Sequence, residues 1–223
     1  MHTGIGQITQ IYLDGSAQVD CPSNLIPTPG QYLHAHASAS DAPLPVPVYF
    51  YDSAPQGFRF APPYPSSWTI GSKLTLRGPL GHGFHFPTSA RKLALIALDE
   101  SPARLHGLIQ TALNQKLEAV LVCNSPTNNL PEDVEVQPLQ AMGEICTWAD
   151  FIAMDVAREN LDPLKEMTSK LWQIPAVRDA QILIHTAMPC GDLAECGVCA
   201  IGVHHDWKMA CKDGPVFTLK DLI

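Results

Sequence analysis

The first 90 residues of the chain carry short runs in which apolar and polar residues alternate. Alternation of this kind predicts half-buried strands, and the clearest runs are residues 6–13, 30–35, 46–51 and 73–77. Proline, glycine, serine and aspartate interrupt the runs, and 12 of the 20 prolines lie here. Proline within a run favours an edge strand or a strand start, because it has no N–H for the ladder. The pattern predicts a small antiparallel barrel.

From Lys92 onward the pattern changes to continuous apolar runs that alternate with amphipathic segments. Ser101 followed by Pro102 is typical of a helix start, and Asn160 is placed to cap a helix over residues 161–171. Strands that alternate with helices indicate a parallel sheet with crossover helices. The expected strands are residues 93–98, 119–123, 151–154 and 181–184.

Together these patterns predict a β plus α/β fold in three parts. Residues 1–90 are expected to form the antiparallel β-barrel and residues 91–185 a Rossmann-like parallel α/β domain. Residues 186–223 form a segment rich in cysteine and glycine, followed by a short tail.

Composition and charge narrow the class of protein. With 46% hydrophobic residues among 223, the chain can bury a core. A formal net charge of -8 opposes a phosphate-binding surface, so nucleic acid is not expected as a partner. The apolar runs are far shorter than the roughly 18 to 20 residues of a membrane span. The first residues lack a basic and then apolar leader, which predicts a cytoplasmic location.

Four of the seven cysteines fall in one short window, as Cys190, Cys196, Cys199 and Cys211, with glycines between them. Glycine permits the tight backbone curl that brings thiolates together, so this window predicts a metal centre. Three close thiolates and a more distant fourth favour a [2Fe-2S] cluster over zinc, which usually takes two Cys-x-x-Cys arms. A Rieske-like centre that uses His204 and His205, and four unrelated cysteines, are the alternatives.

The cysteine segment resembles the [2Fe-2S] segment of the electron-transfer subunit of type B dihydroorotate dehydrogenase. The resemblance rests on residues 188–191, 195–199 and 210–217, although Cys190 and Cys196 are separated by five residues where that family usually has four. In the barrel, residues 77–84 are similar to the family's Gly-Pro-Leu-Gly-Asn-Gly-Phe signature, and residues 29–32 to its Pro-Gly-Gln-Phe strand. The resemblance implies a ferredoxin-reductase-like scaffold with a cluster bound by the four clustered cysteines.

The same resemblance implies an FAD site, but the chain departs from the family's motif. An Arg-Pro-x-Ser strand meets the flavin there, whereas residues 46–49 read Val-Pro-Val-Tyr. Residues 61–67 carry three prolines where a phosphate-binding turn is expected, and proline offers no N–H to an anion. The residues that could contact a flavin are Tyr49, Gly81 and Gly83; the alternative is that Tyr49 and Tyr51 are aromatic residues of the barrel core or rim.

The region expected to bind the nicotinamide dinucleotide departs further from the family's motifs. A dinucleotide site needs a glycine-rich turn after the first strand, and this chain has Asp99 and Glu100 there. The family's Cys-Gly-Pro turn is expected to be replaced by residues 154–156, which include Asp155. NAD(P) binding is therefore not expected, and these carboxylates are interpreted as solvated loop residues, with an acidic crevice as the alternative.

These observations lead to one hypothesis and two alternatives. The first is an electron-transfer subunit that presents a [2Fe-2S] cluster to another redox subunit of an oxidoreductase complex, through residues 190–211 or 78–84. The second is an FAD-containing subunit that relays electrons between NAD(H) and a dihydroorotate dehydrogenase-type catalytic subunit. The third is a subunit for assembly in which the same thiolates hold structural zinc.

Overall fold

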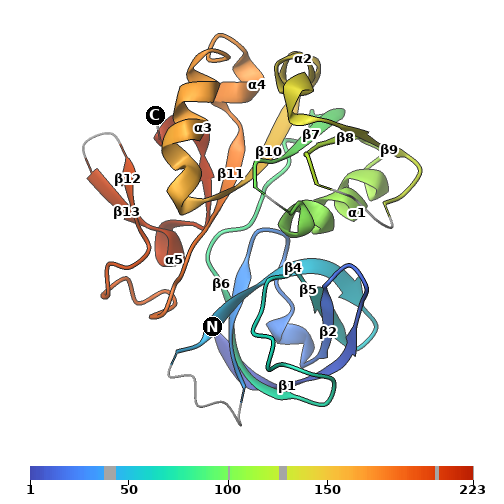
Figure 1. Cartoon of the computed structure of the whole chain (residues 1–223), viewed down its shortest axis with the longest axis vertical. Coiled ribbons are helices and arrows are strands. Elements are labelled where there is room, and N and C mark those ends of the chain that lie inside the picture. Colours follow the sequence, from blue (N-terminus) through green and yellow to red (C-terminus); the bar gives the residue numbers. More distant parts are fainter. Residues whose placement is uncertain (38–43, 100, 126–129, 204–205, 223) are drawn as a thin grey trace.

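The structure is a computed structural model that describes residues 1–37, 44–99, 101–125, 130–203 and 206–222. A closed barrel, an α/β layer and a C-terminal segment lie against one another (Figure 1). The predicted fold class is confirmed, both in the barrel and in the parallel sheet with its helices. Three residues that the sequence singled out, Glu100, His204 and His205, lie outside the described part.

The barrel is built from six antiparallel strands in the order β1-β2-β5-β4-β3-β6, with β6 closing onto β1. Alternate residues point inward, so that Ile8, Val19, Leu33, Phe58 and Leu76 are fully buried in its interior. The strands are β1 (His2–Ile11), β2 (Ala17–Asp20), β3 (Tyr32–Ala37), β4 (Val46–Ala54), β5 (Gly57–Phe60) and β6 (Lys73–Leu80).

The second part is a six-stranded sheet in the order β14-β11-β10-β7-β8-β9. All neighbours are parallel except β14, which pairs antiparallel with β11 at one edge. Its strands are β7 (Lys92–Ala97), β8 (Glu118–Val122), β9 (Val134–Gln137), β10 (Phe151–Ala157), β11 (Gln181–His185) and β14 (Val216–Thr218). Because the chain order reverses between β7 and β10, a crevice is expected at their carboxyl ends.

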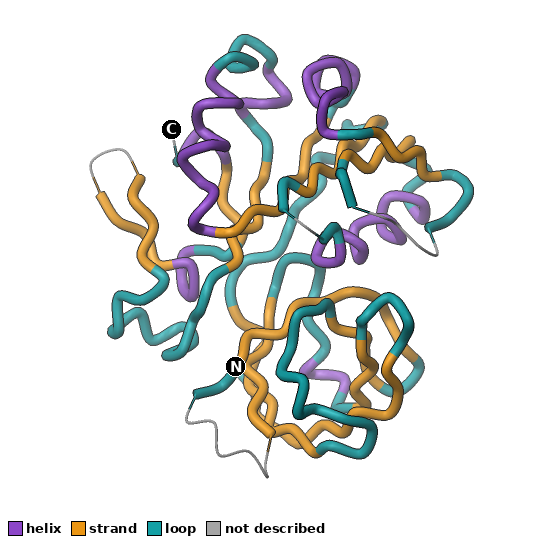
Figure 2. The backbone as a smooth tube through the Cα atoms, in the orientation of Figure 1, coloured by secondary structure: helices purple, strands orange, loops and turns teal. Residues whose placement is uncertain are grey.

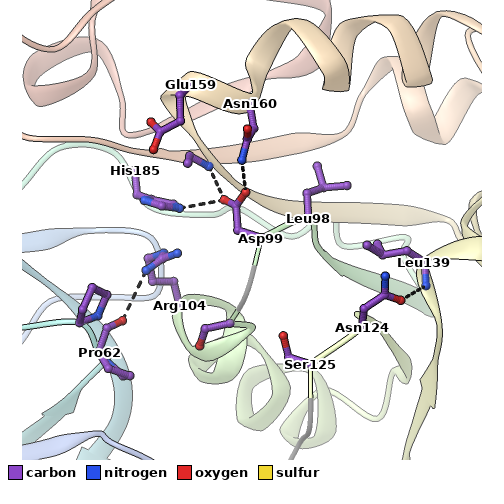
Figure 3. Close-up of a pocket in the computed structure, with 13 residues that line it drawn as sticks. Pro62, Leu98, Asp99, Arg104, Asn124, Ser125, Leu139, Glu159, Asn160 and His185 are labelled. Carbon is purple, nitrogen blue, oxygen red and sulfur yellow. Dashed lines mark hydrogen bonds and ion pairs between the residues drawn. The ribbon is translucent and has the colours of Figure 1, made fainter.

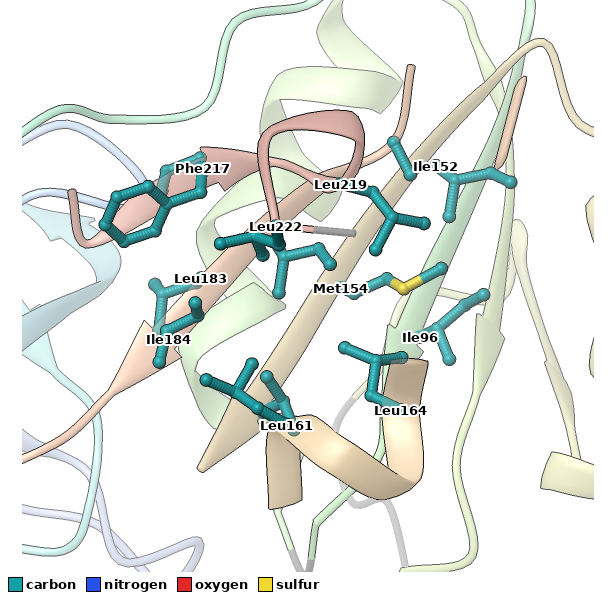
Figure 4. Close-up of a cluster of buried hydrophobic side chains, with 14 of the residues drawn as sticks. Ile96, Ile152, Met154, Leu161, Leu164, Leu183, Ile184, Phe217, Leu219 and Leu222 are labelled. Atoms are coloured by element: carbon teal, nitrogen blue, oxygen red, sulfur yellow. The ribbon is translucent and has the colours of Figure 1, made fainter. Parts of the chain in front are cut away.

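Helices cover both faces of the sheet. On one face α1 (His106–Asn114) packs on Leu93 and Leu95, and it also lies next to β4 of the barrel. On the other face α2 (Met142–Trp148), α3 (Leu161–Ser169) and α4 (Pro175–Arg178) cover Ile96 and Met154. Figure 4 shows this second core, in which Leu164 lies beside Ile96, Leu161 lies on the side of Ile184, and Leu219 of the C-terminal tail joins from the sheet edge.

The helix starts differ in detail from the sequence prediction. The Ala103 N–H donates to Oγ of Ser101 at 3.3 Å, but a 3-10 turn (Ala103–Leu105) precedes α1. Asn160 does precede α3, yet its side chain makes no capping hydrogen bond and donates to Asp99 instead.

The C-terminal segment begins with a long loop, which carries the first three clustered cysteines (Figure 2). After the cysteine loop come the hairpin β12 (Ala200–Val203) and β13 (Asp206–Met209) and the short helix α5 (Ala210–Asp213). Strand β14 then returns to the sheet, so this segment spans both the barrel side and the α/β layer. No helix in the described part of the chain combines the length and apolar character that a membrane crossing requires.

Candidate metal centre

The loop that carries the cysteines is tightly curled. Gly191, Asp192, Ala194 and Gly197 all have positive φ, at 47°, 67°, 58° and 69°. A chain that repeatedly enters the left-handed region reverses direction within a few residues, and so Cys190 and Cys196 face each other across the curl.

The four clustered cysteines contact one another in pairs. The Sγ atoms of Cys190 and Cys211 are 3.9 Å apart, and the Cys211 N–H donates to Sγ of Cys199 at 3.4 Å. The Cys190 thiol also interacts with Cys196, and the Cys211 thiol with Cys199. Cys199 and Cys211 are buried, whereas Cys196 is exposed. A centre held by these thiols would have one buried side and one surface side.

Backbone N–H groups surround the thiols and shift their acidity. Partial burial acts to raise the pKa of Cys190, but hydrogen bonds from Cys196 and from the N–H groups of residues 194–196 lower it to about 7. Burial and the neighbouring Cys199 thiol raise the pKa of Cys211 to about 12. Metal ligation requires deprotonated thiols. A bound metal would therefore replace the thiol protons of these cysteines.

The other three cysteines lie apart from this centre. Cys21 follows β2, Cys123 follows β8 and Cys146 lies in α2. Burial raises the pKa of Cys146 to about 11, as burial and Asp20 do for Cys21. Cys123 and Cys146 are buried and Cys21 is half-buried, and among the described residues none of the three belongs to a group of metal-ligating side chains.

The thiol spacing does not by itself select the metal. Within the described ranges, no group of three or more His, Cys, Asp and Glu side chains is spaced as the ligands of one metal ion. The assignment of a metal centre therefore rests on the pairwise contacts among the four thiols and on the comparison given below.

The barrel and the α/β layer both hold the cysteine loop. The Tyr32 hydroxyl donates to the Cys211 carbonyl oxygen at 3.0 Å. Nη1 of Arg158, just beyond β10, donates to the Val198 carbonyl oxygen at 2.5 Å. Neither contact was predicted, because the partners lie 179 and 40 residues apart in the sequence.

Gly81 and Gly83 lie next to other parts of the chain and line neither of the two cavities described below. A Cβ at Gly81 would lie 2.5 Å from Cδ of Pro215, and the next N–H, of His82, donates to the Gly214 carbonyl oxygen at 2.6 Å. A Cβ at Gly83 would lie 2.7 Å from the Pro29 carbonyl oxygen. The barrel turn thus meets the C-terminal tail of the same chain.

A cavity of about 990 Å³ opens at the carboxyl ends of β7, β8, β10 and β11, where the strand order reverses (Figure 3). A smaller one of about 310 Å³ adjoins it and is lined by Tyr49 and Pro47 of β4. Both cavities share Pro62, Pro63, Arg104, Glu159 and His185.

Asp99 lies at the centre of the larger cavity and is largely buried, with 13% of its side chain exposed. It accepts hydrogen bonds from Nδ2 of Asn160 at 2.6 Å, from Nε2 of His185 at 3.0 Å, and from the Ala157 N–H. Asp155 is 1% exposed, and both its oxygens accept from Nε of Arg104. The interpretation of these carboxylates as solvated loop residues is therefore wrong.

The sequence prediction placed the turn that replaces the family's Cys-Gly-Pro turn at residues 154–156, and this position is wrong. Residues 154–156 lie inside β10 and are fully enclosed, and the turn that follows this strand is Arg158–Asn160. The predicted strand, residues 151–154, stops before Asp155, whereas β10 continues through Asp155 to Ala157. That aspartate, inside an otherwise apolar run, was the available signal of a buried ion pair.

The residues of the cleft do not fit the diphosphate of a dinucleotide. Among the described residues lining these two cavities, Arg104 is the only Lys or Arg, and it is paired with Asp155. The Ala157 N–H and the Asn160 amide, which could donate to a phosphate, already donate to Asp99. The Tyr49 hydroxyl is buried without a hydrogen-bond partner, which is the one feature here that would suit an additional polar group.

A family comparison decides the nature of the cysteine segment. Residues 185–223 match the iron-sulfur cluster binding domain of dihydroorotate dehydrogenase B. The matched residues include all four clustered cysteines. The resemblance predicted from the sequence is thereby confirmed, and the residues present fit an iron-sulfur cluster.

Two curated proteins of Pyrococcus furiosus are similar to this chain. One is a probable dihydroorotate dehydrogenase B (NAD(+)), electron transfer subunit, 26% identical over 171 residues, which cover 69% of this chain. The other is sulfhydrogenase 1 subunit gamma, 43% identical over 42 residues, or 19% of this chain. The chain matches 64% of the length of the first relative and 14% of the second.

Solved structures share the fold over most of the chain. A structure described as NADH-dependent reduced ferredoxin-NADP oxidoreductase superposes with a TM-score of 0.75 and 18% identity, covering 99% of this chain and 90% of that one. The ferredoxin reductase of carbazole 1,9a-dioxygenase gives a TM-score of 0.60 and 14% identity over 82% of this chain and 69% of that one. At these identities the likeness establishes a ferredoxin-reductase-like fold.

Proposed function

We propose that this chain is an electron-transfer subunit that carries a [2Fe-2S] cluster on Cys190, Cys196, Cys199 and Cys211. The observation that carries the proposal is the pairwise contact among these four thiols in a segment that matches an iron-sulfur cluster binding family. A cluster of this type accepts and donates one electron at a time. The rest of the chain supplies the scaffold that holds the loop.

Each part of the loop has its own role in this proposal. Cys199 and Cys211 anchor the cluster on its buried side, where Tyr32 fixes the Cys211 carbonyl. The N–H groups of residues 194–196 donate to the Cys190 thiolate and so stabilise negative charge on sulfur. Exposed Cys196 brings the opposite side of the cluster to the surface, where electrons are exchanged.

The partner is another redox subunit of an oxidoreductase complex. The described cleft offers no site for a dinucleotide phosphate, so electrons must arrive from and leave to centres on other chains. Of the two expected contact regions, residues 190–211 are favoured, because Leu193 and Val198 beside Cys196 are exposed. The other region is partly occupied within the chain, where Gly81 and His82 meet Gly214 and Pro215. All seven cysteines are free, in keeping with a cytoplasmic location.

A second candidate function is an FAD-containing subunit of the same kind. It is favoured by the unpartnered hydroxyl of Tyr49 beside the cavity of about 310 Å³. The diphosphate of FAD would have to bind outside the two described cavities, because their residues do not fit a diphosphate. A structural zinc site remains the third reading of the same thiols.

The test uses electron paramagnetic resonance of the anaerobically purified, dithionite-reduced protein. Replacing Cys199 by Ser should abolish or strongly distort the signal, whereas Cys21→Ser should leave it intact. An intact signal in Cys199→Ser, or the loss of the signal in Cys21→Ser, would overturn the assignment. Flavin bands in the absorption spectrum would favour the second candidate, and a colourless protein with bound zinc would favour the third.

A further inference from the structure

The first part of the cysteine loop turns its carbonyl groups toward two side chains of the barrel. Nη2 of Arg77, on β6, donates to the carbonyl oxygens of Cys190 at 3.0 Å and Gly191 at 2.6 Å. Nε2 of His34, on β3, lies 2.6 Å from the Met188 carbonyl oxygen. The barrel thus contacts the carbonyl groups of Met188, Cys190 and Gly191, at the start of the loop.

The neighbours of His34 fix its protonation. A carbonyl oxygen accepts, so Nε2 must carry the proton that it donates to Met188. Arg77 only donates, so Nδ1, which is 3.4 Å from Nη2 of Arg77, must be the unprotonated nitrogen. Burial lowers the pKa of His34, in agreement with a neutral ring. Arg77 is then the formal positive charge of this pair.

Gly191 allows the close approach of Arg77. Its φ is 47°, and a Cβ there would lie 2.2 Å from Cε1 of His34 and 2.5 Å from Nη2 of Arg77. A side chain at this position would displace the guanidinium from the Gly191 carbonyl oxygen.

The peptide unit between Gly191 and Asp192 connects Arg77 to the cluster site. Its carbonyl oxygen accepts from Arg77, and its N–H, that of Asp192, donates to the Cys211 thiol. A cation at the oxygen end polarises the peptide and strengthens the donor at the nitrogen end. The Arg77 charge is therefore linked to Cys211 through this peptide unit and its hydrogen bond.

We propose that Arg77 sets the reduction potential of the cluster, acting as a positioning residue through the peptide unit between Gly191 and Asp192. The inference rests on the proposed function. Reduction adds one negative charge to the cluster, and a nearby cation and a polarised N–H donor both stabilise the reduced state more than the oxidised state. Removing the Arg77 charge should lower the midpoint potential.

Three variants separate the charge of Arg77 from its structural contacts. Arg77→Gln removes the charge and keeps a group that donates to a carbonyl oxygen. Arg77→Lys keeps the charge but places it on a shorter side chain, farther from the two carbonyl oxygens that Nη2 of Arg77 contacts. Lys73→Gln, the control, removes one positive charge from an exposed position on the same strand.

The experiment is a redox titration of the purified, cluster-containing protein, followed by electron paramagnetic resonance. We expect wild type and Lys73→Gln to share the highest potential, Arg77→Lys to lie below them, and Arg77→Gln to lie lowest. An unchanged potential in Arg77→Gln would overturn the inference.

Iron content is measured in every variant, so a lost cluster is not mistaken for a shifted potential. If Arg77→Gln assembles no cluster, a second neutral variant, Arg77→Met, decides: a potential below that of Lys73→Gln supports the inference, and an equal potential overturns it. A wild-type protein without a cluster would instead contradict the proposed function.

Discussion

Two glycines of the cysteine loop, Gly191 and Gly197, share a left-handed backbone but differ in their surroundings. A Cβ at Gly191 would lie 2.2 Å from His34, whereas a Cβ at Gly197 would have no neighbour within 4 Å. Both substitutions by alanine carry the backbone cost of positive φ, roughly 1 kcal/mol. Only Gly191→Ala adds a steric clash with the barrel.

Gly191→Ala should therefore lose most of the cluster, while Gly197→Ala keeps it. Iron per chain in protein purified in parallel measures this difference. Equal iron in the two variants would show that the contact between the loop and the barrel does not support the cluster.

The carboxylate of Asp99 lies where the phosphates of a dinucleotide would need hydrogen-bond donors. It accepts from His185, Asn160 and the Ala157 N–H. The wild-type chain should therefore show no binding of NADH in calorimetric titration. Asp99→Ser, which frees the donors, should bind NADH more tightly than wild type, whereas Asp179→Ser, at a position 71% exposed, should not.

A dissociation constant in the low micromolar range for wild type would contradict this account of the cleft. Equal binding by Asp99→Ser and wild type would show that other residues close the site.

At the scale of elements, an ionic cluster pins the turn between β1 and β2 to β5. Partial burial acts to raise the pKa of Asp14, but hydrogen bonds from Ser16 and Tyr51 and the charge of Arg59 lower it to about 2. Nη2 of Arg59 lies 2.8 Å from Oδ2 of Asp14. This contribution to stability is fully present above the unfolded pKa, near 3.8, and is lost as the pH falls toward 2.

Thermal unfolding between pH 5 and pH 2 tests this link. Wild type should lose melting temperature more steeply than Asp14→Asn over this interval, because the variant has no proton to take up at this position. Parallel losses in both proteins would remove Asp14 from the acid response.

The longer elements were predictable and the short ones were not. Strands β7 and β8 appear in the sequence as continuous apolar runs, and α3 begins where Asn160 indicated. Strands β9 and β14 have four and three residues, too few for a pattern. The pairing of β14 with β11 depends on the tertiary fold, which places a tail beside a strand more than 30 residues earlier.

The cysteines of the metal centre were predictable from the sequence, but the barrel residues that contact the cysteine loop were not. The four cysteines are close in sequence, so clustering and glycine spacing reveal them. Their barrel neighbours are separated from the loop by 113 to 179 residues, as for Arg77 and Tyr32. Both residues lie in segments that resemble the family's barrel signatures, but a sequence pattern does not show which distant side chains the fold brings to the loop.

At the scale of the whole molecule, the barrel and the α/β layer both form hydrogen bonds with the cysteine loop. Arg77 and His34 hold its beginning, and Arg158 holds Val198 farther along. The ferredoxin-reductase-like scaffold thus holds the loop, while hydrogen-bond donors that line its cleft are engaged by Asp99 and Asp155. The central claim is that this scaffold presents a [2Fe-2S] cluster.

The most direct measurement is the metal and sulfide content of the anaerobically purified protein together with its visible absorption. The account predicts iron and acid-labile sulfide in equal amounts, about two of each per chain, with iron-sulfur absorption bands that bleach on reduction. A colourless protein that contains zinc and no sulfide would contradict it.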